Sequence, residues 1–280
     1  MTTDYAAWTG ASDSAEDTIG LAPALAAAAT FDDTTTQFAA GSALPPLWHW
    51  FYFLPRAPQS RLSADGHPQR GGFMPPIELP RRMFAGARLR FLQPLTIGKP
   101  ATRSAVIRDV SQKDGKTGKL AFVTVGYAIS QDGRVCIEEE QDIVYREPGA
   151  PLAAPQPREL PPVPDGSWTR MIRPDPTLLF RFSALTFNAH RIHYDRDYAV
   201  TIEGYPGLVV HGPLTAMLLM ELVRLNALRP VTAFTFRGQA PLFDLAPFRV
   251  VATADAGNTV QLEAQGPDGR TAMAASAELA

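Results

Sequence analysis

The chain has 280 residues, of which 45% are hydrophobic and 19% charged, and its formal net charge at pH 7 is −2. This balance is typical of a globular protein and excludes a disordered chain or one that binds nucleic acid through bulk positive charge. The single cysteine, Cys136, excludes an intramolecular disulfide, so we expect a reducing, cytoplasmic environment.

The first 50 residues predict no targeting or membrane segment. Residues 1–10 carry no Lys or Arg, and the apolar run Leu21–Ala29 is too short to cross a bilayer. The aromatic segment Pro45–Phe53 (PPLWHWFYF) is predicted to be a short helix. We expect its large side chains to lie in the core: Trp48, Trp50, Phe51 and Phe53.

Alternating apolar and polar residues then predict a run of four strands. The expected strands are Ala87–Phe91, Thr102–Val110, Leu120–Ser130 and Val135–Tyr145. Seven prolines within Pro148–Pro164 forbid a regular helix or a central strand there. We therefore predict a degenerate N-terminal module over residues 1–147, a proline-rich linker over 148–166 and a catalytic module over 167–280.

The second half predicts two helices followed by a second set of strands. Asp175 is a suitable N-cap for a helix over Asp175–Phe187 with Pro176 in its first turn. The segment Pro213–Leu225 is apolar on nearly all faces, which is typical of a buried helix. The expected strands are Thr232–Phe236, Phe248–Thr253, Thr259–Ala264 and Thr271–Ala277. The predicted class is α+β, with a long helix wrapped by an antiparallel β-sheet in each module.

A polar loop, Asn188–Asp195, follows the first of these helices and is the candidate site. Three of the five histidines of the chain, His190, His193 and His211, lie in or near it. His211 is followed by Gly212, which opens the predicted buried helix. A histidine is the usual side chain for proton transfer near neutral pH, and the start of a buried helix offers free backbone donors.

The segments Ser183–Asp195 (SALTFNAHRIHYD) and Gly204–Leu214 (GYPGLVVHGPL) resemble the MaoC-like hydratases and dehydratases. Alignment on His193 puts Asn188 at the catalytic Asp of that family, His190 at its Asn and Gly212 at its oxyanion-hole glycine. An amide cannot act as a general base, so Asn188 departs from the general family pattern.

Asn188 is normal in a narrower branch that this chain resembles, which holds mitochondrial-type hydroxyacyl-thioester dehydratases and itaconyl-CoA or mesaconyl-CoA hydratases. The segments Leu44–Trp50, Arg82–Phe91 and Asp142–Arg146 are similar to that branch too. The resemblance implies a double hot-dog fold and a hydro-lyase that acts on an acyl-CoA thioester. It implies no cofactor, because coenzyme A is part of the substrate, no metal, and neither nucleic acid nor membrane as a partner. It leaves a homodimer open.

The resemblance and the chemistry together assign expected roles. Adding water needs a group that takes a proton and donors that stabilise the thioester oxygen, and we expect His193 and the Gly212 N–H in these roles. Asn188 and His190 are expected to orient water or the hydroxyl group. We expect the substrate to be held by Arg191, Arg82, Arg88, Val210 and His211. The arginines suggest a short dicarboxylic acyl group such as itaconyl or mesaconyl, with citramalyl-CoA as the hydrated partner.

Several alternatives remain open on the sequence alone. His49 and His67 are expected to be structural, and the fatty-acid type of hydroxyacyl-thioester dehydratase is the alternative substrate class. A thioesterase or a non-catalytic acyl-binding protein could share the fold, although the absence of a carboxylate at Asn188 argues against the first. The spacing of His190, His193 and Asp195 would also permit a metal site.

Overall fold

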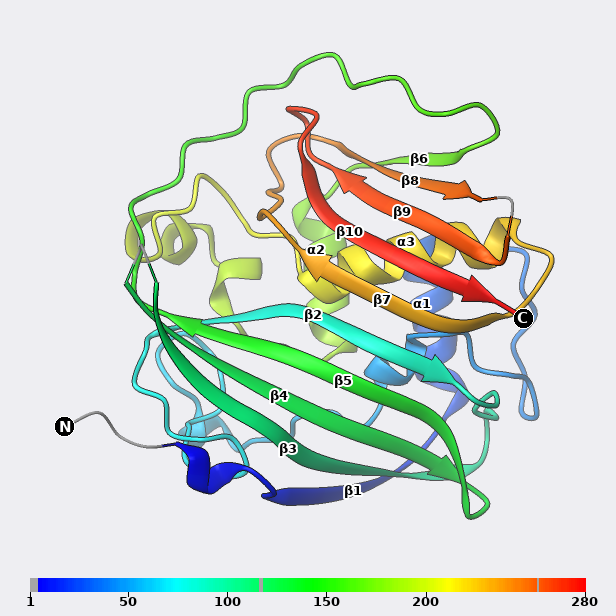
Figure 1. Ribbon diagram of the computed structural model, residues 1–280, viewed down its shortest axis with the longest axis horizontal. Coiled ribbons are helices and arrows are strands. Elements are labelled where there is room, and N and C mark those ends of the chain that lie inside the picture. Colours follow the sequence, from blue (N-terminus) through cyan, green and yellow to red (C-terminus); the bar gives the residue numbers. More distant parts are fainter. Residues whose placement is uncertain (1–4, 116–117, 256) are drawn as a thin grey trace.

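The computed structural model describes residues 5–115, 118–255 and 257–280. Its strands form one ten-stranded sheet of order β1-β3-β4-β5-β2-β7-β10-β9-β8-β6 (Figure 1). Every neighbouring pair in this order is antiparallel. The first five strands therefore occupy one side of the sheet and the last five the other, and β2 and β7 join the two halves.

The four strands expected in the first half are confirmed. The strands of this half are β1 (Ser12–Thr18), β2 (Arg81–Phe91), β3 (Pro100–Gly115), β4 (Gly118–Gln131) and β5 (Arg134–Arg146). β1 (SDSAEDT) was not expected, because it has no alternating apolar pattern. It pairs only with β3 at one edge of the sheet, and charged side chains are typical of protected edge strands.

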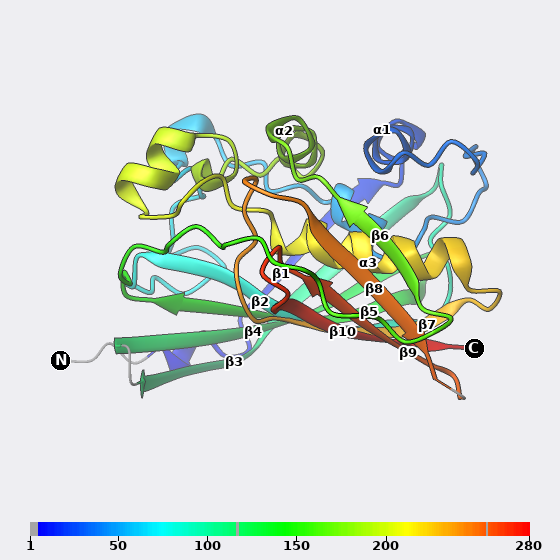
Figure 2. The ribbon, with the colours of Figure 1, turned by 90° about the horizontal axis from the view of Figure 1, so that it is seen from above.

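The four strands expected in the second half are confirmed as well. The strands here are β6 (Trp168–Ile172), β7 (Val231–Gly238), β8 (Phe248–Ala254), β9 (Thr259–Gln265) and β10 (Thr271–Leu279). β6 directly follows the proline-rich stretch and pairs with β8 as the other edge strand. β6 and β8 rise beside α3 rather than lying flat beneath it (Figure 2).

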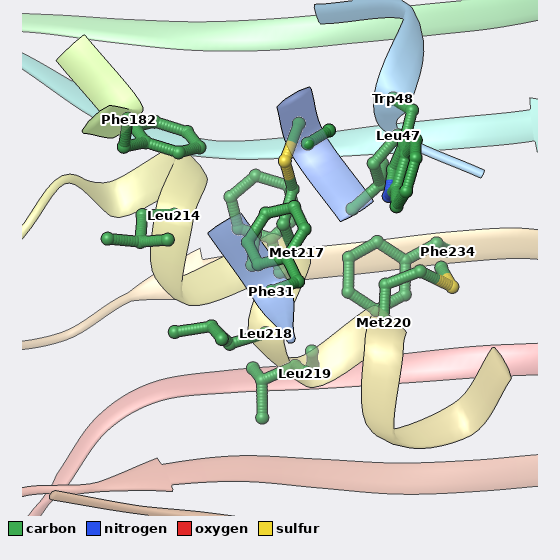
Figure 3. Close-up of a cluster of buried hydrophobic side chains, with 14 of the residues drawn as sticks. Phe31, Leu47, Trp48, Phe182, Leu214, Met217, Leu218, Leu219, Met220 and Phe234 are labelled. Carbon is green, nitrogen blue, oxygen red and sulfur yellow. The ribbon is translucent and has the colours of Figure 1, made fainter. Parts of the chain in front are cut away.

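The buried helix predicted at Pro213–Leu225 is α3 (Gly212–Asn226). Every residue from Leu214 to Val223 is buried, as its apolar faces require. Leu219 and Met220 are fully buried in a cluster that also contains Phe234 of β7 and Trp48 of the first half (Figure 3). The core of the second half thus continues into aromatic side chains from the first half.

Two further helices, α1 (Leu21–Phe31) and α2 (Pro176–Leu185), pack on each other and lie above α3 (Figure 2). The Asp175 side chain accepts a hydrogen bond from the Leu178 N–H at 2.9 Å, which confirms the predicted cap of α2. The short helices are Ala6–Trp8, Trp48–Phe51, Gln59–Arg61 and Arg191–His193, all 3-10, and the π-helical turn Tyr198–Ile202.

The aromatic segment Pro45–Phe53 forms only the four-residue 3-10 helix Trp48–Phe51, so it is much shorter than α3. Its expected core residues are buried, except for Trp50, which is half-buried. The first half therefore contains no helix as long as α3 within the described residues, although its sheet repeats the plan of the second half.

The stretch between β5 and β6 contains neither helix nor strand. It touches the rest of the chain through few backbone contacts, such as Leu152 N–H to the Gly204 carbonyl at 2.9 Å. We propose that it separates a degenerate module over residues 1–147 from a catalytic module over 167–280, with 148–166 as linker. No helix of the described chain has both the length and the apolar character that a bilayer crossing needs.

Candidate active site

A cavity of about 1180 Å³ lies between the two halves of the molecule. Small-ligand pockets usually hold about 300–1,000 Å³, so this cavity is large enough for an extended ligand. The polar loop after α2, the start of α3 and the strand β2 all line it, together with residues 49–68 of the first half. The structure brings four histidines together here: His67, His190, His193 and His211.

The loop after α2 is shaped by a left-handed residue and a turn. Phe187 has φ +49°, and the Asn188 N–H donates to the Ser183 carbonyl at 2.8 Å, which closes the helix. The Asn188 Oδ1 accepts from the His190 N–H at 3.0 Å in an Asx turn. Asn188 lines the cavity, so its Nδ2 is the group left to donate to a ligand.

His193 is held by its backbone neighbours in one orientation. Its Nδ1 donates to the Val209 carbonyl at 2.7 Å, which leaves Nε2 as a proton acceptor. Its ring stacks on the ring of His211 at 3.6 Å between centroids and 18° between planes. His211 Nε2 and Ser183 Oγ lie 2.8 Å apart, so a residue of α2 fixes the His211 ring of this stack.

Burial keeps these imidazoles neutral. Desolvation lowers the pKa of His193 to about 3, with a smaller contribution from His190. It likewise lowers the pKa of His190 to about 3, and the pKa of His211 falls well below its usual value. At neutral pH the rings of His190, His193 and His211 are therefore uncharged.

The start of α3 contributes Val210, His211 and Gly212 to the cavity wall. The Gly212 N–H is among the first four of the helix, which no residue of the helix itself can pair. A methyl group added at Gly212 would lie 3.6 Å from the Phe84 carbonyl oxygen, which is an ordinary contact. Packing within the protein therefore does not explain the glycine, whereas close approach of a ligand to the backbone does.

His67, which the sequence predicts to be structural, lies at the cavity beside the histidine loop. His67 and Asp65 lie in a turn of the first half and line the cavity. The centroid of the His67 ring is 4.0 Å from that of His190, and its Nδ1 lies 3.0 Å from Asp65 Oδ2. Nothing in the sequence around residue 67 predicts this, because its partner is 123 positions further along the chain (190 − 67).

Arg82 faces the cavity, whereas Arg88, which was expected to bind substrate, does not. Arg88 is exposed and pairs with Asp142 at 2.7 Å and with Glu140 at 3.1 Å. The reason is a β-bulge between Phe84 and Gly86 of β2, which moves later residues to the opposite face. Among the described residues, the Arg82 side chain has no hydrogen bond or ion pair with protein groups, whereas the neighbouring Arg81 pairs with Glu203.

The expectation that Arg191 binds the substrate is not supported by its position, because it does not line the main cavity. Its guanidinium binds Asp195 Oδ2 at 2.8 Å and the Ala64 carbonyl at 3.1 Å. It also lies 4.1 Å from the ring centre of Tyr198. Arg191 thus fastens the histidine loop to the turn that carries Asp65.

A second polar region of the cavity lies in the first half. His49 Nε2 and Glu139 Oε2 are 2.9 Å apart and buried, so His49 forms an ion pair or hydrogen bond at the cavity wall. Arg103 lies over the ring of Tyr127 at 5.6 Å, and its buried Nε has no hydrogen-bond partner within the described residues. The sequence did not indicate Arg103 or Tyr127 as site residues.

One group of side chains offers metal-ligand atoms. Donor atoms of Asp65, His67 and His190 lie within 4.8 Å of one another. Asp65 and His67 are hydrogen-bonded to each other, so the group is a bonded pair beside a third ring rather than an open set of ligands. The combination of His190, His193 and Asp195 that spacing permits does not assemble among the described residues, because Asp195 is paired with Arg191.

The structure is an α+β fold in which a histidine and a helix N-terminus face a cavity between two halves, as the resemblance to MaoC-like hydro-lyases implies. The sequence model of the hydroxyacyl-thioester dehydratase type 2 family matches residues 47–244. The chain belongs to this family, and it is a hydro-lyase.

Three comparisons illustrate the relationship. Mesaconyl-C(4)-CoA hydratase of Chloroflexus aurantiacus is 67% identical over 276 residues, covering 99% of this chain and 98% of that protein. The mitochondrial hydroxyacyl-thioester dehydratase type 2 of Schizosaccharomyces pombe is 29% identical, covering 75% and 77%. The solved structure of a MaoC-like dehydratase from Phytophthora capsici has TM-score 0.69 at 14% identity, covering 98% and 96%. The predicted double hot-dog fold is confirmed.

Proposed function

We propose that this protein adds water to the α,β double bond of a short dicarboxylic acyl-CoA thioester, with mesaconyl-CoA as substrate and citramalyl-CoA as product. The relative at 67% identity, whose name states that it hydrates mesaconyl-C(4)-CoA, supports this substrate class. The observation that carries the proposal is the unpaired Arg82 at the wall of a cavity that also holds His193.

The site residues divide the chemistry between them. His193 Nε2 takes a proton from water as the water oxygen bonds to the β-carbon, and it returns the proton to the leaving hydroxyl in the reverse direction. The Gly212 N–H, at the positive end of α3, stabilises the charge that develops on the thioester oxygen. Asn188 Nδ2 and His190 hold the water, while Val210 and His211 shape the wall around it.

Arg82 is the residue that we propose for the free carboxylate of the substrate. It is half-buried and lowers the pKa of His190 by its charge, so it lies close to the histidine loop. A mesaconyl group carries its carboxylate near the reacting carbons, so the binding group has to be near this loop as well. An arginine suits that role because its planar fork binds both oxygens of a carboxylate.

The alternative is the fatty-acid type of 3-hydroxyacyl-thioester dehydratase. The 29% identity to the mitochondrial dehydratase of Schizosaccharomyces pombe supports this alternative. An apolar acyl chain, however, would leave the Arg82 guanidinium and the buried Arg103 Nε without a hydrogen-bond partner in the cavity. We also predict that the protein is cytoplasmic and that it forms a homodimer. Cell fractionation would test the first prediction and light scattering the second.

Incubation of the purified protein with mesaconyl-CoA tests the proposed function. We expect the absorbance of the enoyl thioester to fall and the product to gain the mass of one water molecule. Free coenzyme A would instead indicate a thioesterase, and binding without turnover would indicate an acyl-binding protein. Either outcome would contradict the proposal.

Arg82→Met should reduce kcat/KM for mesaconyl-CoA by roughly ten- to a hundredfold, because a charged hydrogen bond contributes about 1.5–3 kcal/mol. The value for crotonyl-CoA, which has no carboxylate, should change much less. Arg90→Met is the matched control, because Arg90 is on the same strand but pairs with Glu138 on the exposed face. Equal losses for both substrates would show that Arg82 does not recognise the carboxylate.

A further inference from the structure

Asp65 and His67 form a pair inside the cavity that the mechanism above does not use. Asp65 Oδ2 accepts from His67 Nδ1 at 3.0 Å, and Asp65 Oδ1 accepts from the His67 backbone N–H at 3.0 Å. Burial alone would raise the pKa of Asp65, but these hydrogen bonds and the charge of His67 outweigh it and hold the pKa well below its usual range. The cavity therefore contains a carboxylate, although Asn188 does not supply one.

The pair is fastened to the histidine loop by the backbone. The Asp65 carbonyl accepts from the Arg191 N–H at 2.9 Å. Gly66, between the two residues, has φ +91°, and a β-carbon there would lie 1.8 Å from the Ala189 carbonyl oxygen. Only glycine permits this approach, so the turn of the first half and the loop of the second half fit each other closely.

The His67 ring is part of the same row of imidazoles as the catalytic ring. The centroids of His67 and His190 are 4.0 Å apart, and those of His190 and His193 are 5.4 Å apart. Because Nδ1 is bonded to Asp65, Nε2 is the nitrogen that can exchange a proton with a ligand. Within the described residues no hydrogen bond involves this atom.

We propose that His67 is a second catalytic acid–base residue, which exchanges a proton with the α-carbon of the substrate, and that Asp65 is its positioning residue and counter-ion. The inference rests on the proposed hydration reaction. It gives His67 the acid–base role that the Asn188 amide cannot fill, and it divides the two proton transfers between the two halves of the chain.

The proton balance closes in both directions. In hydration His193 Nε2 takes a proton from water, the water oxygen bonds to the β-carbon, and the π electrons bond the α-carbon to the proton that leaves His67 Nε2. In dehydration His67 takes the α-proton, and the proton on His193 leaves with the hydroxyl as water. The proton gained by one imidazole returns to the other by exchange with water between turnovers.

The titratable groups in contact with His67 come from two elements. Asp65 lies on the same turn, and His190 lies on the histidine loop with His193 behind it. Burial keeps the rings of His190 and His193 neutral, so Asp65 is the charged side chain that is bonded to His67 within the described residues.

His67→Asn is the sharpest test, because the asparagine amide can still donate to Asp65 but has no equivalent of Nε2. We expect kcat for hydration to fall about a hundredfold with little change in KM. Asp65→Asn should also lower kcat rather than raise KM, but by a smaller factor, because it leaves His67 Nε2 in place. The variant Arg90→Met should behave as the wild type. Mesaconyl-CoA is the substrate, or crotonyl-CoA if the wild type prefers it.

The rate at which solvent deuterium exchanges into the α-position of the hydrated product gives a second readout, which we expect to fall in His67→Asn by about the same factor as hydration. A wild-type kcat in His67→Asn would overturn the inference, as would one bound metal ion per chain whose removal by a chelator abolishes activity. A wild type that hydrates neither thioester would instead contradict the proposed function, so the two failures are distinguishable.

Discussion

His193→Ala should lower the turnover of hydration by about a hundredfold to ten-thousandfold, the usual contribution of a positioned acid–base group. The Nε2 atom of His193 is the acceptor that the Val209 carbonyl leaves free, and burial keeps the ring neutral by lowering its pKa to about 3. Protonation of this ring should therefore reduce activity only in strong acid. Steady-state kinetics on mesaconyl-CoA measure the loss.

His193→Asn separates chemistry from packing. Its amide can still donate to the Val209 carbonyl, but it cannot take a proton, so we expect it to be as inactive as His193→Ala while its thermal midpoint stays closer to that of the wild type. Near-normal turnover in either variant would remove His193 from the mechanism.

Arg224→Met should lower the free energy of unfolding by about 3–5 kcal/mol, the typical cost of breaking a buried ion pair. The Arg224 guanidinium binds Asp33 at 2.7 Å and Glu221 at 3.0 Å, and both carboxylates are buried. Glu221 also accepts from the Trp48 indole N–H at 2.9 Å. The network therefore joins α3 to the first half, and its loss leaves two carboxylates without a counter-ion.

Urea denaturation at several pH values measures this effect. Burial alone would raise the pKa of Asp33, but hydrogen bonds from Thr36 and Arg224 outweigh it and hold the pKa below its usual 3.8. Because the pKa of Asp33 is lower in the folded than in the unfolded chain, ionised Asp33 stabilises the fold above the unfolded-state pKa, and this stabilisation is lost as the pH falls. The difference in unfolding free energy between the wild type and Arg224→Met should therefore shrink below about pH 4. Adding Asp33→Asn and Glu221→Gln to Arg224→Met should recover part of the lost stability, because no unpaired carboxylate then remains. A loss of unfolding free energy under about 1 kcal/mol in Arg224→Met would contradict the account.

Most of the fold could be predicted from local pattern. The continuous apolar character of Leu214–Val223 identified α3, and the Asp175-Pro176 pair identified the start of α2. β1 could not be predicted, because an exposed edge strand needs no apolar face. The helix expected at Pro45–Phe53 is mostly irregular because its aromatic side chains pack on α1 and α3 from a single 3-10 turn.

The site was predicted only where its residues are close in the sequence. Asn188, His190, His193 and Gly212 all line one cavity, as expected from their motif. The side of β2 on which each arginine lies depends on the β-bulge between Phe84 and Gly86. The isolated Gly86 is a local sign of a bulge, but a glycine alone does not fix the register of the residues that follow it. The pairing of the Asp65 turn with the histidine loop depends on tertiary structure and has no local signal.

The ratio of kcat/KM for mesaconyl-CoA to kcat/KM for crotonyl-CoA tests the central claim most directly. Because Arg82 faces the cavity without a protein partner, we expect the dicarboxylic thioester to be preferred by roughly ten- to a hundredfold, with citramalyl-CoA as its product. A higher value for crotonyl-CoA, or for a longer apolar enoyl thioester, would contradict the account and assign the protein to fatty-acid-type dehydration.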